Sequence, residues 1–220
     1  MKWQYRNGAL ECGQRPLLMG ILNVTPDSFS DGGLFDDSSA ALRRALTMVG
    51  DGADLVDIGG ESTRPGSSPV SAIEECDRVI PVIESLSSER PDIIISIDTT
   101  KAEVARKALK AGAHIVNDIS GGLWDPEMLP VVHQMKAGYI CTHTLDHPKK
   151  MQEDPRYDDV VTEIRNFLFN RKQALNEAGI GEDAVCFDVG IGFGKTLEHN
   201  LALIRAGAED AFSSLERPML

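Results

Sequence analysis

The chain passes from an apolar run to a polar loop within the segment Gly20-Ile21-Leu22-Asn23-Val24-Thr25-Pro26-Asp27-Ser28-Phe29-Ser30-Asp31-Gly32-Gly33. An apolar run over residues 17–22 stops at Asn23, and a loop of hydroxyl, carboxylate, proline and glycine residues follows, with the ring of Phe29 in its middle. A buried strand that leads into a polar loop at its carboxyl end is the way α/β enzymes present reactive groups. The same strand–loop pattern recurs along the rest of the chain.

Six strand–loop–helix units are predicted in strict alternation. The expected strands are 17–22, 54–58, 93–97, 114–116, 139–142 and 184–187. The expected helices are 38–49, with Ser38 as N-cap, and 73–86, 102–110, 127–135, 158–177 and 197–204. Each strand reads as short and apolar throughout, which is typical of a parallel sheet buried on both faces. Residues 3–12 predict a β-hairpin with an Asn7-Gly8 turn, which would plug one end of a larger body.

The alternation fits both a doubly wound open sheet and a (β/α)8 TIM barrel. Glycine-rich phosphate chemistry concentrates after one or two strands of a doubly wound sheet. Here all six strands end in a polar or glycine-rich cluster, which favours the barrel, because a barrel builds its site from several strand ends. Six units do not complete eight, and residues 217–220 read as the start of a seventh strand. We therefore expect a single barrel domain over residues 1–220 that is incomplete at its C-terminal side and lacks the last strands.

Composition excludes several classes of function. The net charge is −12, from 22 Lys and Arg against 34 Asp and Glu, which argues against a nucleic-acid-binding face. Apolar runs are only a few residues long, too short to span a membrane. The four cysteines stand singly without a CxxC pair, which favours reduced thiols in a cytoplasmic protein. An anionic small substrate would need local cations or a metal to overcome the overall charge.

Strand-end carboxylates are the strongest candidates for ligand recognition. Asp98 and Asp188 each occupy the first polar position after an apolar strand. A carboxylate there can accept paired hydrogen bonds from an amino-pyrimidine edge, and Asn117 offers both a donor and an acceptor to such a flat heterocycle. The alternative is that these side chains cap the helices that follow.

Cationic and metal-binding candidates lie in the loops. Arg64, beside Pro65, has a forked donor that suits a phosphate, although it can equally be a surface arginine that pairs with an acid. Residues 190–196 match neither a P-loop nor a dinucleotide-binding glycine motif, and we interpret them as a tight turn that brings backbone N–H groups, Lys195 and Phe193 near a ligand. A hard cation held by Asn23 and substrate phosphates is favoured over a zinc site.

These blocks resemble the dihydropteroate synthase family. The match rests on five ordered segments, residues 20–33, 57–66, 97–101, 117–122 and 188–195. The resemblance implies a (β/α)8 barrel that condenses 4-aminobenzoate with 6-hydroxymethyl-7,8-dihydropterin pyrophosphate, giving 7,8-dihydropteroate and pyrophosphate in folate biosynthesis. It also implies a cytoplasmic homodimeric transferase that uses Mg²⁺ and needs neither nucleic acid nor membrane.

The resemblance also implies roles for individual residues. The implied catalytic residues are Asn23, Thr63, Arg64, Asp98, Asn117 and Asp188, with Asn23 as the Mg²⁺ ligand. The implied substrate-binding residues are Thr63, Arg64, Pro65, Asp98, Asn117, Ile119, Asp188, Phe193 and Lys195. The implied lid over the site consists of Thr25, Pro26, Asp27, Ser28 and Phe29.

This sequence departs from the family pattern in places. The family's Ser-Arg-Lys-Ser and Arg-x-His blocks of the seventh and eighth strands are not in this sequence. Val189 stands where the family usually has proline, and Asp146 where it tends to have glycine. Two rival interpretations are a methyltetrahydrofolate methyltransferase domain and a binding or scaffolding homologue that keeps the fold without turnover. The segments 25–33 and 62–66 favour the synthase, because a methyltransferase has no use for loops that grip pyrophosphate.

Overall fold

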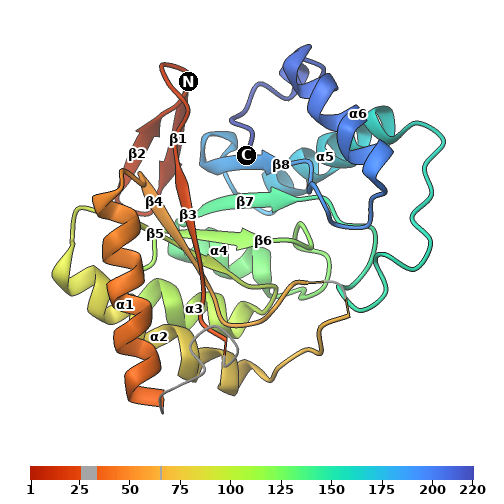
Figure 1. Cartoon of the computed structure of the whole chain (residues 1–220). Helices are drawn as coiled ribbons and strands as arrows, with labels where there is room; N and C mark the ends of the chain where they lie inside the picture. The colour runs from red at the N-terminus through yellow and green to blue at the C-terminus, as the bar shows by residue number, and fades with distance from the viewer. Residues whose placement is uncertain (26–33, 65) are drawn as a thin grey trace.

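A small antiparallel hairpin precedes the main sheet. The computed structural model describes residues 1–25, 34–64 and 66–220, and its first strands are β1 (Lys2–Tyr5) and β2 (Gly8–Glu11) (Figure 1). Tyr5 pairs with Gly8, so the turn residues are Arg6 and Asn7, and the prediction of an Asn7-Gly8 turn is wrong by one residue. A Cβ atom on Gly8 would lie 2.7 Å from the Tyr5 hydroxyl, so the glycine is needed for this close approach rather than for the turn.

The predicted alternation of strands and helices is confirmed. The strands are β3 (Met19–Asn23), β4 (Leu55–Gly59), β5 (Ile94–Asp98), β6 (Ile115–Asp118), β7 (Gly138–Thr142) and β8 (Val185–Asp188). The helices are α1 (Leu34–Gly50), α2 (Ala72–Glu89), α3 (Ala102–Ala111), α4 (Met128–Met135), α5 (Val160–Glu177) and α6 (Leu197–Ala208), with short 3-10 turns at Glu182–Ala184 and Ser213–Leu215. Ser38 lies inside α1 rather than at its N-cap, because residues 34–37 contain no glycine or proline and continue the helix.

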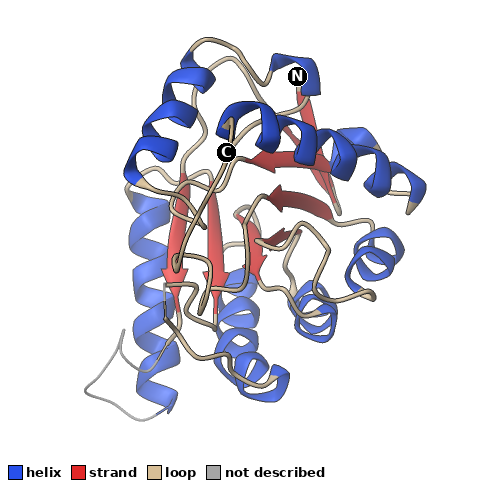
Figure 2. Ribbon diagram, turned by 90° about the vertical axis from the view of Figure 1, so that its right-hand side faces the viewer, coloured by secondary structure: helices blue, strands red, loops and turns tan. Residues whose placement is uncertain are grey.

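The six main strands form one parallel sheet in the order β3-β4-β5-β6-β7-β8. A doubly wound sheet reverses its strand order partway, whereas a barrel keeps the order of the chain. The helices lie around the outside of the strands (Figure 2). Beyond β8, Met219 pairs in parallel with Phe187, and the Leu220 backbone N donates to the Phe187 carbonyl at 2.8 Å. The barrel class predicted from the sequence is therefore confirmed in its strand order.

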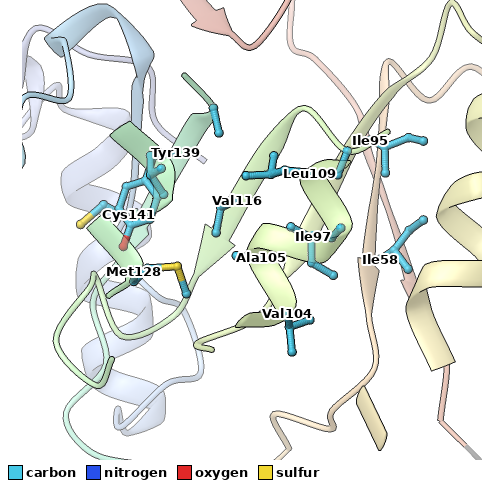
Figure 3. Close-up of a cluster of buried hydrophobic side chains, with 14 of the residues drawn as sticks. Ile58, Ile95, Ile97, Val104, Ala105, Leu109, Val116, Met128, Tyr139 and Cys141 are labelled. Atoms are coloured by element: carbon cyan, nitrogen blue, oxygen red, sulfur yellow. The ribbon is translucent and has the colours of Figure 1, made fainter. Parts of the chain in front are cut away.

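Two faces of the sheet carry different side chains, because successive residues of a strand point to opposite sides. The outer face packs against the helices through fully buried residues that include Ile58, Ile97 and Tyr139 (Figure 3). Burial of each such aliphatic side chain stabilises the fold by about 1.5–3 kcal/mol. Figure 3 shows Ile97 and Val116 of the strands beside Val104, Ala105 and Leu109 of helix α3.

The inner face is apolar at one end and polar at the other. At the amino ends of the strands, Leu55, Ile94 and Ile115 cluster with Trp3 of the hairpin. The Trp3 indole N–H donates to the Ala184 carbonyl at 3.0 Å, so the hairpin closes this end as predicted. Toward the carboxyl ends the same face carries buried Asp57 and Ser96, so the description of every strand as apolar throughout is wrong. None of the described helices is long and apolar enough to cross a membrane.

Candidate active site

Four neighbouring strands place predicted site residues side by side at their carboxyl ends. Asn23 is in register with Gly59, Gly59 with Asp98, and Asp98 with Asn117. A Cβ atom on Gly59 would lie 3.2 Å from Asp98 Oδ2 and 3.7 Å from Asn23 Oδ1. The glycine therefore leaves open a space that is bordered by two side-chain oxygen atoms. Three residues predicted from separate segments of the sequence meet at this edge.

Beneath this row lies a buried carboxylate that the sequence analysis did not single out. Asp57 is 3% exposed, and its Oδ2 accepts a hydrogen bond of 3.0 Å from the Asn117 side-chain nitrogen. Among the described residues, Asp57 Oδ1, Asn117 Oδ1 and the Ser96 hydroxyl are buried and have no hydrogen-bond partner. A signal was available in the sequence, because a carboxylate inside the apolar run Leu55-Val56-Asp57-Ile58 requires a partner when it is buried.

The electrostatics of the site centre on Asp98. Burial raises the pKa of its carboxyl group well above the usual value, and the negative charge of Asp57 raises it further, followed by smaller effects of Glu75, Asp118 and Glu61. Burial likewise raises the pKa of Asp57, against the opposing effect of the neighbouring Ser96 and Asn117 side chains. The site is thus rich in acceptors and poor in donors, and a ligand that offers N–H groups would stabilise its ionised carboxylates.

The second half of the site lies on β7 and β8, where Thr142 is in register with Asp188. Asp188 Oδ1 accepts a 2.8 Å hydrogen bond from the Gly190 backbone, and its Oδ2 lies 3.4 Å from the Thr142 hydroxyl. Burial raises the pKa of Asp188. Gly190 has φ +68°, and a Cβ atom there would lie 2.0 Å from the His143 carbonyl oxygen. Only glycine fits this position, as expected for the predicted tight turn between strand and helix.

Lys195 lies beneath that turn. Its side chain is buried, and Nζ lies 2.8 Å from the Phe193 carbonyl oxygen, 3.3 Å from the His143 carbonyl oxygen and 3.1 Å from His143 Nδ1. Burial lowers the pKa of Lys195 to about 7. Burial and the charge of Lys195 lower the pKa of His143 to about 3. Lys195 thus ties the loop that carries half-buried Phe193 to the end of β7, and a direct contact of either residue with a ligand stays a prediction.

The loop after β4 carries Thr63 and Arg64 and is held by an ion pair and a backbone hydrogen bond. Thr63 is half-buried and Arg64 is exposed, while Pro65 lies outside the described residues. Glu61 precedes them and forms a 2.6 Å ion pair with Lys101, which also contacts the buried Glu75 at 2.6 Å. The Gly66 backbone N–H donates to the Pro148 carbonyl at 3.2 Å, which joins this loop to the segment after β7.

The remaining predicted residues follow β3 and β6. Thr25 is half-buried, whereas the other predicted lid residues, Pro26, Asp27, Ser28 and Phe29, lie outside the described part of the chain. Ile119 is buried directly after β6.

A second overlooked carboxylate, Asp118, sets the shape of the turn that carries Ile119. Asp118 is buried, and it accepts hydrogen bonds from the Ser120 backbone at 2.8 Å, the Ser120 hydroxyl at 2.7 Å, the Gly122 backbone at 3.0 Å and the Tyr139 hydroxyl at 2.9 Å. Such a saturated acceptor has no capacity left for a ligand, so its function is to build the turn.

The sheet has the strand order of a parallel barrel and carries hydrogen-bond acceptors at its strand ends, an arrangement that suits the class of proteins that bind flat, donor-rich heterocycles. Residues 19–211 match the family model described as "Pterin binding enzyme", and the chain belongs to that family. Within it, a dihydropteroate synthase from Synechocystis is 50% identical over 193 residues, which cover 88% of this chain and 66% of the relative. The resemblance seen in the sequence is therefore confirmed.

Solved dihydropteroate synthases share the fold. The enzyme from Xanthomonas albilineans with 4-aminobenzoic acid is 41% identical with a TM-score of 0.86, and the match covers 94% of this chain and 72% of that one. The enzyme from Burkholderia cenocepacia complexed with 7,8-dihydropteroate is 44% identical with a TM-score of 0.82, covering 94% and 70%. This chain thus spans about two thirds of the length of the Synechocystis relative.

Proposed function

We propose that the chain is a dihydropteroate synthase, which condenses 4-aminobenzoate with 6-hydroxymethyl-7,8-dihydropterin pyrophosphate and releases pyrophosphate. The observation that carries the proposal is the row of acceptors at the carboxyl ends of the strands. Asp98 lies beside Asn117 in this row, and Asp188 ends β8 at the same edge of the sheet. The identity of 41–50% to synthases, two of them solved with 4-aminobenzoic acid or with dihydropteroate, supports the same reaction.

Some of the proposed site residues bind the pterin, and another stabilises the leaving pyrophosphate. Asp98, Asn117 and Asp188 would hold the pterin through its ring N–H and amino groups, because carboxylate and carboxamide oxygens accept such donors. Substitution at the pterin methylene builds negative charge on the departing pyrophosphate, and the guanidinium of Arg64, which is exposed on the loop after β4, would stabilise that charge. The arylamine is already nucleophilic and needs mainly positioning.

Mg²⁺ fits this arrangement as a proposed cofactor. Asn23 Oδ1 and an Asp98 oxygen border the open space at Gly59, and magnesium prefers oxygen ligands while it keeps water and phosphate in its shell. Among the described residues, no group of three or more His, Cys, Asp or Glu side chains is arranged to hold a metal, so Asn23 would share the ion with pyrophosphate. When bound, Mg²⁺ offsets the charge that develops on the leaving group.

The assembly and location of the protein are also part of the proposal. We propose a homodimer, which sedimentation velocity would test, and a cytoplasmic location. The family resemblance supports both, and the location is further supported by four free cysteines, three of them buried.

The proposal is tested by incubating the chain with both substrates and Mg²⁺. We expect pyrophosphate and dihydropteroate to appear in equal amounts. Transfer of a methyl group from methyltetrahydrofolate would support the rival methyltransferase instead. Binding of the pterin without turnover would identify a homologue that lacks catalysis, and failure to bind the pterin at all would refute the proposal.

A further inference from the structure

Asp57 is a buried polar residue of the inner face to which the proposed reaction gives no role. It lies on β4, two residues before Gly59, and is buried. A buried carboxylate is costly unless it is hydrogen-bonded to a partner. Its Oδ2 accepts a hydrogen bond from the side-chain nitrogen of Asn117, which lies 60 positions later in the chain.

We propose that Asp57 is a positioning residue, which fixes the Asn117 carboxamide so that its oxygen, and not its nitrogen, faces the pterin. This inference rests on the proposed function, because it assigns the pterin as the ligand. A carboxamide can rotate by half a turn and exchange donor for acceptor with little change in shape. The carboxylate of Asp57 removes that ambiguity, because an ionised carboxylate accepts hydrogen bonds and cannot donate them.

The unpartnered oxygen of Asn117 is the second observation for this role. Asn117 is 8% exposed, and its Oδ1 is buried without a hydrogen-bond partner among the described residues. An orphaned acceptor in a native protein requires an explanation, and a ligand N–H supplies one. Asn117 is in register with Asp98, so the fixed amide oxygen and the Asp98 carboxylate present two acceptors side by side.

Recognition by acceptors alone would make the site selective for one edge of the heterocycle. An amino-pyrimidine edge carries adjacent N–H donors, whereas a flipped Asn117 would oppose one of those donors with its own NH₂ group. A site built to hydrogen-bond a polar group loses affinity when a donor meets a donor, since both remain unpaired. Asp57 therefore acts on pterin affinity without touching the pterin.

The experiment measures pterin binding by calorimetry, with dihydropterin pyrophosphate as the probe. Asp57→Leu removes the acceptor while it keeps a side chain branched at Cγ, and we expect the dissociation constant to rise about tenfold or more. In an Asn117→Ala background the same substitution is expected to have little further effect, because its route to the ligand is already gone. Thermal unfolding of each variant checks that the fold is kept.

An exchange of the two residues keeps the test decisive if the leucine variant does not fold. Asn117→Asp alone places two carboxylates in contact and should weaken binding about tenfold. Adding Asp57→Asn should restore near-native affinity, because the new amide donates to the new carboxylate, whose second oxygen still faces the ligand.

The outcomes separate this inference from the proposed function. Loss in the leucine variant that disappears in the Asn117→Ala background, together with recovery in the exchanged pair, supports the positioning role. Equal losses in both backgrounds, unchanged affinity in the folded leucine variant, or no recovery in the exchanged pair would overturn it. If the unmodified chain fails to bind the pterin, the proposed function is refuted and this inference falls with it.

Discussion

Replacing Asp98 by asparagine should weaken pterin binding while it stabilises the empty protein. Asp98 stands between Gly59 and Asn117 in the row of strand ends, and its carboxylate is the acceptor on which the proposed recognition depends. Asparagine keeps the shape but replaces one acceptor oxygen by a donor NH₂ group. The substitution therefore separates the cost of holding a buried charge from the benefit of using it.

The magnitude of the binding loss follows from the kind of hydrogen bond. A hydrogen bond to a charged group contributes about 1.5–3 kcal/mol, which corresponds to about 10- to 150-fold in the dissociation constant. The gain in stability follows from the raised pKa of Asp98. The unfolded chain loses this proton near the usual pKa of 3.8 and the folded protein only at higher pH, so folded stability falls as pH rises between these two values. Asparagine does not ionise, so the Asp98→Asn protein does not lose stability over this pH range.

The assay combines calorimetry with urea denaturation. At pH 7 we expect the Asp98→Asn protein to bind dihydropterin pyrophosphate more weakly and to unfold at a higher urea concentration. Below pH 4 the difference in stability should vanish. The matched control is Asp92→Asn, because Asp92 forms an exposed ion pair with Arg90 at 2.7 Å and should leave affinity unchanged. Native affinity in folded Asp98→Asn protein would refute the assigned role.

Three further substitutions test the residues that hold the loops and turns around the site. Lys195→Met should lower the free energy of unfolding by about 1–3 kcal/mol, because it leaves the Phe193 carbonyl and His143 unpaired. Because the pKa of Lys195 is lowered in the folded protein, the folded lysine loses its proton before the unfolded one. Denaturation should therefore show the unmodified protein gaining stability over this variant as pH rises from 7 to about 10. A flat difference over that range would contradict a buried lysine. Asp118→Ala should cost about 3 kcal/mol or more, measured by urea denaturation, because four donors lose their acceptor; a loss below about 1 kcal/mol would contradict the assigned network. Gly190→Ala should disturb the β8 turn and weaken pterin binding in calorimetry, because its Cβ would overlap the His143 carbonyl; native affinity would show that the turn can shift.

The order of strands and helices could be predicted because local patterns carry it. Apolar runs of strand length, each followed by a polar cluster and a helical segment, set the alternation. Ends of elements were less secure. Ser38 looked like an N-cap, yet the helix continues back to Leu34, because a helix extends wherever the backbone permits it. The hairpin turn was misplaced because Gly8 serves the Tyr5 ring rather than a turn of positive φ.

The placement of the strand-end side chains at one edge of the sheet could be predicted for a topological reason. Parallel strands bring their carboxyl ends to one edge, so Asp98, Asn117 and Asp188 had to share a mouth once the barrel order was assumed. Lys195 shows the limit of that reasoning. Its place after a glycine turn predicts a ligand contact, and that contact stays a prediction, whereas the hydrogen bonds of its Nζ to the Phe193 and His143 carbonyls could not be predicted. Sequence position does not determine the direction of a long, flexible side chain.

The sequence by itself determined the class of fold and the chemical groups at its mouth, since both follow from periodicity and from which residue ends each strand. Only the tertiary structure decided which side chains lie beneath the row of acceptors at the strand ends. The contact between Asp57 and Asn117 joins residues 60 positions apart, and it depends on the register of β4, β5 and β6. A shift of one residue in either pairing would turn one side chain to the opposite face. Register is fixed by packing across the whole sheet, which no local stretch of sequence contains.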